Sequence, residues 1–288
     1  MSALRWPAMK PLLLVLCLSL LVTACSRIGL AYRNLDWLVP WRLNDYLSLD
    51  RQQQAWLKPR VQAHLQWHCS RELPRYIDWL QTTESILAQP QPDSAQLLEQ
   101  FTQFDAALKR IGVEITPTAI ELLQGLSEQQ VSELYAALDE NYLEDRQDFL
   151  DPPLATQISE RQTRMQKRLR PWLGRLNNTQ TVHIAAWAQS LGEQNRLWLE
   201  NRQLWQAELR QVIAERDSAD FAQRLTRLLQ QRERFYSDEY RARYGRSRQA
   251  LATLFSQLLS SSDKAQRERL SHRLRDLRRD LAEQQCSV

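Results

Sequence analysis

The sequence contains Leu126-Ser127-Glu128-Gln129-Gln130 and two stretches of the same pattern, Leu49-Asp50-Arg51-Gln52-Gln53 and Leu176-Asn177-Asn178-Thr179-Gln180. In each stretch a short oxygen-bearing side chain can accept hydrogen bonds from the first free N–H groups of a helix. The glutamine three residues later can reach back to the backbone of the capping residue. All three stretches therefore predict helix starts.

The composition extends this prediction to an all-α chain, a multi-helix bundle with long amphipathic helices. Only 6 of 288 residues are glycine, which suits helices better than the glycine-dependent turns of sheets and nucleotide loops. From the capping patterns and the prolines we predict helices over residues 50–69, 71–88, 94–112, 118–125, 128–149, 155–175, 179–216, 219–258 and 263–284.

We predict four segments. On the N-terminal features described below, residues 1–24 are expected to form a signal peptide and 25–42 a lipidated N-terminal segment; the helix pattern predicts an N-terminal helical half over 43–150 and a C-terminal helical half over 154–288. The connector Asp151-Pro152-Pro153 separates the halves, which form either one large domain or two halves that share a core. The aromatic residues of 26–42, Trp37 and Trp41 among them, predict that this segment packs on the domain or lies at a lipid interface.

The N-terminus has the order of a secretory signal. Arg5 and Lys10 precede an apolar run from Leu12 to Val22, and small residues follow. Eleven helical residues reach about 16 Å, roughly half of a hydrocarbon core of about 30 Å. The run is therefore too short for a permanent membrane span and predicts a removable signal.

The stretch Leu21-Val22-Thr23-Ala24-Cys25 resembles the lipobox of bacterial lipoproteins. The resemblance implies cleavage before Cys25 and acylation of its thiol, and two or three acyl chains hold a protein firmly to a bilayer. By similarity to lipoprotein sorting in Gram-negative bacteria, Ser26 implies the outer membrane, with the domain facing the periplasm. The expected partners are the membrane and an envelope protein.

Charge and cysteine content narrow the function classes. Removing Arg5 and Lys10 with the signal lowers the formal charge from +4 to +2, which argues against a nucleic-acid partner. Cys17 leaves with the signal and Cys25 takes the lipid, so Cys69 and Cys286 remain. In an oxidising compartment these two form a disulfide or stay as separate thiols.

The segment from Tyr32 to Tyr76, with Trp67-His68-Cys69-Ser70-Arg71-Glu72-Leu73-Pro74 inside it, resembles a family of Gram-negative lipoproteins known only as a domain of unknown function. The resemblance implies a helical fold and lipid anchoring, and it brings no activity. The family often has arginine where this chain has Cys69, so it implies no disulfide. The Leu126–Gln130 turn is similar to a motif of Spy-like periplasmic chaperones, which implies a chaperone as an alternative function.

No phosphate loop, nucleophile elbow or zinc-binding signature is present. His64, His68 and Glu72 step by four along a predicted helix and can face one metal ion, or they can belong to a structural cluster beside Pro74. The structural cluster is the more common arrangement, so we expect no metal and no cofactor. We predict a binding or scaffold protein without catalytic residues; an enzyme whose site residues meet only in the fold is the second alternative.

Overall fold

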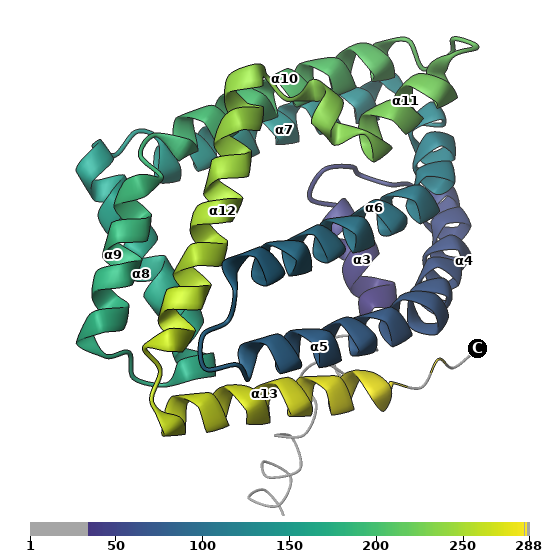
Figure 1. The fold of residues 1–288 in the computed structure, drawn as a ribbon. Coiled ribbons are helices and arrows are strands. Elements are labelled where there is room, and N and C mark those ends of the chain that lie inside the picture. Colours follow the sequence, from purple (N-terminus) through teal and green to yellow (C-terminus); the bar gives the residue numbers. More distant parts are fainter. Residues whose placement is uncertain (1–33, 285, 287–288) are drawn as a thin grey trace, which may run out of the picture.

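The computed structural model describes residues 34–284 and Cys286, and every regular element among them is a helix, which confirms the all-α prediction (Figure 1). The helices are α3 (Leu35–Leu43), α4 (Arg51–Trp67), η2 (His68–Glu72), α5 (Leu73–Leu87), α6 (Ser94–Gln124), α7 (Glu128–Phe149), α8 (Leu154–Leu173), α9 (Asn178–Ser190), α10 (Gln194–Ala214), α11 (Phe221–Gln230), η3 (Arg232–Phe235), α12 (Asp238–Ser260) and α13 (Lys264–Ala282). Within these residues no helix is long and apolar enough to cross a bilayer. Cys25 and the predicted signal lie outside the described residues.

The three predicted capping boxes begin α4, α7 and α9. A fourth box, which the sequence analysis did not identify, begins α13: the Asp263 side chain accepts from Gln266 N, and Gln266 Oε1 accepts from Asp263 N. Its first residue follows Ser262 and not a leucine, so it departs from the pattern of the other three.

The glutamines of these boxes join the helix starts in pairs. Gln53 and Gln130 donate to each other's side-chain oxygens at 3.0 and 2.6 Å, which joins α4 to α7. Gln180 and Gln266 do the same at 2.9 and 3.0 Å, which joins α9 to α13. Gln130, Gln180 and Gln266 are buried. Each pair therefore connects, by hydrogen bonds, the first turns of two helices that are far apart in the sequence.

Three predicted boundaries are wrong. The helix expected over 179–216 is divided into α9 and α10, because the chain turns at Gly192, where φ is +48°. The helix expected over 219–258 is interrupted after Gln230, and Ser237 caps the new start of α12. The break expected between 112 and 118 is absent, since α6 continues through Pro117. Packing of α6 on α11 and α12 outweighs the cost of an interior proline, about 3 kcal/mol.

Three clusters of apolar side chains form the core. The first combines residues of α4, α6 and α7 with residues of α10 and α11, so it takes side chains from both sides of the 151–153 connector. The second joins α8, α9 and α12, and the third joins α5, α6 and α12. The two helical halves thus share a core.

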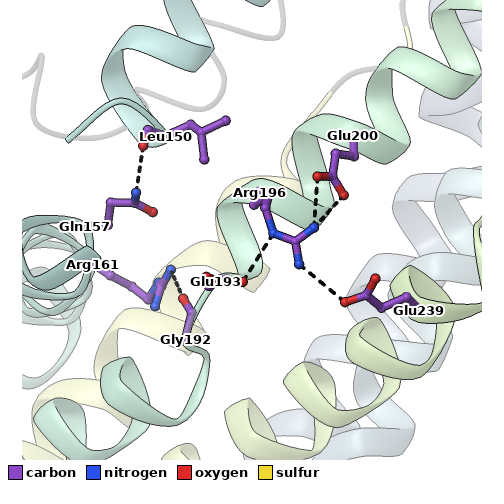
Figure 2. Close-up of polar contacts among 8 residues, drawn as sticks. All are labelled: Leu150, Gln157, Arg161, Gly192, Glu193, Arg196, Glu200 and Glu239. Carbon is purple, nitrogen blue, oxygen red and sulfur yellow. Dashed lines mark hydrogen bonds and ion pairs between the residues drawn. The ribbon is translucent and has the colours of Figure 1, made fainter. Parts of the chain in front are cut away.

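A buried arginine holds the corner where α7, α8, α9 and α10 meet. Arg161 is 7% exposed and donates to Ala188 O at 2.8 Å, Gly192 O at 3.2 Å and Asn195 Oδ1 at 3.2 Å. Burial disfavours the charged guanidinium and lowers the pKa of Arg161. The backbone carbonyls at the C-terminal end of α9 carry partial negative charge, which stabilises the cation. Figure 2 shows this corner together with Arg196, which binds three glutamates nearer the surface.

Candidate functional site

A groove of about 680 Å³ lies between α5, α6 and α13, and we call it the α5–α6–α13 groove. Figure 1 shows α5 and α13 side by side, with α6 following α5 in the chain. Its apolar lining consists of Tyr76, Trp79, Leu80, Phe104, Ala107, Leu108, Leu277 and Leu281. Phe104 and Leu108 are 52% and 51% exposed, so α6 presents large apolar side chains beside the groove.

A buried carboxylate contacts the arginines of this groove. Glu72 has no exposed side-chain surface and accepts hydrogen bonds from both Arg75 and Arg110. Arg110 approaches with Nε and Nη2 at 2.8 to 3.1 Å, the two-pronged geometry that suits a carboxylate. The hydrogen bonds from Arg110, more than any other interaction, hold the pKa of Glu72 below its ordinary value. The carboxylate therefore stays ionised and fixes the two guanidinium groups that line the groove.

Glu72 belongs to η2, a turn of π-helix between α4 and α5, and such turns are frequent at functional sites. His68 in the same turn lies against Tyr76, with Nε2 and the phenolic oxygen 3.2 Å apart. Burial lowers the pKa of His68 although Glu72 acts in the opposite direction, and burial raises the pKa of Tyr76. Both rings are therefore favoured in their neutral forms beside the charged Glu72–Arg110 pair.

The three residues considered for a metal ion have separate partners. His64 binds Glu114 through Nδ1 at 3.1 Å and Thr118 through Nε2 at 2.8 Å, so it joins α4 to α6. His68 and Glu72 have the partners described above, and the π-helical turn interrupts the regular α-helical register that the spacing argument assumed. Across the described part of the chain, no group of three histidine, cysteine or acidic side chains is arranged to hold a metal ion.

Cys69 and Cys286 form a disulfide, with their Cα atoms 5.5 Å apart. The bond ties the segment after α13 to the π-helical turn that carries Glu72. Arg275 and Arg278 of α13 also form ion pairs with Glu84 of α5, and α13 packs along α5 and α8. Because Leu277 and Leu281 form one wall of the groove, the disulfide fixes the end of that wall.

Glu72 does not have the environment of a general base. A general base needs a free lone pair and a pKa near the working pH, whereas Glu72 is fully paired with two cations and its pKa is lowered. Sequence reasoning missed Arg110, Phe104 and Leu108 as members of a site. Phe104 and Leu108 stand four residues apart, the spacing of one helix face, but nothing in the sequence links them to residue 72 or to α13.

Replacing Glu72 by glutamine should weaken the fold in a pH-dependent way. The paired carboxylate has a lowered pKa, so its stabilising effect is complete above its ordinary pKa of 4.5 and is lost as the pH falls through the lowered value. At pH 7, Glu72→Gln should reduce the free energy of unfolding by about 3 kcal/mol, because two arginines lose their buried counter-charge. The difference between wild type and variant should shrink as acid is added below pH 4.5.

Urea unfolding at a series of pH values measures this difference. Glu121→Gln is the matched control, because Glu121 pairs with Arg60 at the surface and its side chain is 56% exposed; it should change stability by less than about 1 kcal/mol. Parallel pH profiles for wild type and Glu72→Gln would contradict this account of the carboxylate.

Removing the disulfide should loosen α13 more than the rest of the fold. The bond closes a loop across 217 residues, so Cys69→Ser/Cys286→Ser should lower the free energy of unfolding by as much as about 5 kcal/mol. Hydrogen exchange of the variant should rise most over residues 275–282 and least in the core of α10. Alkylation of the denatured, unreduced wild-type protein should find neither thiol free; two reactive thiols would refute the bond.

Comparison with known proteins assigns most of this fold to one family. No curated protein and no solved structure matches the chain. A family model described as a family of unknown function (DUF6279) matches residues 45–241, which run from the turn before α4 into α12. The match includes Glu72, Arg110 and the two groove walls on α5 and α6. The resemblance to a family known only as a domain of unknown function is confirmed to that extent, and the match does not test lipid anchoring. Since the match covers more than half of the 288 residues, the chain belongs to this family of unknown function.

Proposed function

We propose that this protein is a lipoprotein of the bacterial cell envelope, anchored through acylated Cys25, that binds an apolar segment of an envelope protein in the α5–α6–α13 groove. The order of basic residues, apolar run and Leu21–Cys25 lipobox supports the anchor. Ser26 supports the outer membrane as its destination, with the helical domain on the periplasmic side.

The groove is the observation that carries the binding function. Its volume of about 680 Å³ lies within the range of roughly 300 to 1,000 Å³ that is typical of ligand sites. Apolar side chains from α5, α6 and α13 line it, and two of them, Phe104 and Leu108, remain half exposed to solvent. Covering such side chains with a partner removes apolar surface from water, which favours association.

The charged groups of the groove favour a polypeptide partner over a purely apolar one. Arg75 and Arg110 share one carboxylate, Glu72, and each remains partly exposed, by 54% and 35%, while Asp78 and Glu99 add acidic side chains to the same lining. A polypeptide segment offers apolar side chains for the walls, carbonyl oxygens for the arginines and N–H groups for the carboxylates. Binding, with no turnover, is the function that this combination supports.

Site-specific photo-crosslinking in living cells tests the proposal. A photoreactive amino acid at Phe104 or Leu108 should give a discrete adduct with one envelope protein. The same amino acid at Val182 on α9 or Leu204 on α10 is the matched control, because these side chains are 66% and 51% exposed but lie outside the groove. Leu277→Asp, on the opposite wall, should abolish the adduct at Phe104.

The pattern of adducts separates the alternatives. A broad smear of many clients at the groove positions would favour a Spy-like chaperone over a scaffold with one partner. Equal adducts at the groove and control positions, or an adduct at Phe104 that Leu277→Asp leaves unchanged, would contradict groove binding.

A further inference from the structure

Helix α3 has a mostly apolar sequence, although several of its large apolar side chains are exposed. Its sequence, Leu-Asp-Trp-Leu-Val-Pro-Trp-Arg-Leu, contains two charged residues. Trp37 and Trp41 are 54% and 52% exposed, more than most other aromatic side chains of the described residues. A helix of this composition is normally covered by apolar surroundings on both sides.

The fold covers one side of α3. The helix packs along α4, and Leu43 contacts the first core cluster. Trp37 and Trp41 stand four residues apart, so they share a face of the helix. Their rings pack edge to face, with centroids 6.3 Å apart. The two indole rings therefore form one outward-facing apolar ridge, separate from the side that holds the helix to the domain.

The sequence places this ridge close to the expected lipid anchor. Eight residues separate Cys25 from Asn34, and even a fully extended chain of that length spans no more than about 30 Å. A domain held at Cys25 by acyl chains therefore has α3 within reach of the bilayer surface. Tryptophan is enriched at that surface, because its ring enters the apolar boundary while its N–H remains among polar groups.

We infer that α3 docks on the surface of the anchoring membrane, with Trp37 and Trp41 inserted among the lipid headgroups. The inference rests on the proposed anchor for its location. Arg42 stands beside Trp41, with its guanidinium carbon 5.9 Å from the ring centroid. It pairs with Asp45 through Nη1 at 2.7 Å, but its side chain is 67% exposed, so its other N–H groups can donate to lipid phosphates. Two attachments, the acyl chains and α3, fix the orientation of the domain on the membrane, whereas acyl chains alone leave it free to tumble.

Fluorescence quenching by brominated lipids tests this contact. The full acylated protein is reconstituted in vesicles of phosphatidylethanolamine and phosphatidylglycerol, with lipids brominated near the headgroup end of the acyl chain. Tryptophan emission should fall, and Trp37→Phe/Trp41→Phe should lose most of that quenching. Trp172→Phe/Trp187→Phe is the matched control, because both rings pack against the second core cluster; it should retain the quenching.

The lipid anchor is tested separately by measuring whether labelled fatty acid enters the protein. Wild type should incorporate the label and Cys25→Ala should not. Acylated protein whose quenching is the same in wild type and Trp37→Phe/Trp41→Phe would overturn docking by α3 and leave the anchor intact. Quenching that depends on the two tryptophans in protein that carries no fatty acid would support docking and refute the anchor. Circular dichroism of each variant checks that the helical fold is unchanged.

Discussion

The fold depends on the hydrogen bonds between paired capping glutamines. In each pair the glutamine amide makes three kinds of hydrogen bond. Its oxygen accepts from the backbone N–H of its own capping residue, its NH₂ group donates to the amide oxygen of its partner, and the same NH₂ group donates to a backbone carbonyl of another segment. Gln180 donates to Leu258 O and Gln266 to Arg175 O. A buried amide costs stability unless its donors and acceptors are satisfied, and here they are. The pairs therefore fix where four helices begin relative to one another.

This constraint reaches the candidate site through α13. The Gln180–Gln266 pair fixes the first turn of α13 to α9, and the Cys69–Cys286 disulfide fixes the segment after its last turn to η2. Between these ends α13 packs on α5 and α8, with Leu274 buried and Leu270 against the second core cluster. Attachment at both ends gives the α5–α6–α13 groove a rigid wall. Rigid walls favour binding, because less conformational freedom is lost when a partner docks.

The sequence predicted those parts of the structure that are decided within a few residues. Capping boxes act over four positions, so the starts of α4, α7 and α9 could be located from the residues alone. The turn at Gly192 and the continuation of α6 through Pro117 differ from the predicted helix ranges, because packing against neighbouring helices decides whether a chain turns or continues there. The partner of Glu72 could not be predicted, since Arg110 lies 38 residues away on another helix. For Cys69 and Cys286 the sequence left a disulfide and two separate thiols open, because 217 residues separate them.

A double-mutant cycle on Gln180 and Gln266 tests the central claim most directly. If each amide supports the other, Gln180→Ala and Gln266→Ala should be non-additive, with a coupling free energy of about 1 to 3 kcal/mol in chemical unfolding. Gln130→Ala combined with Gln180→Ala is the matched control, because these residues belong to different pairs and their effects should add within about 0.5 kcal/mol. Additive losses for Gln180 and Gln266 would show that each glutamine merely caps its own helix, and the account of the fold would be wrong.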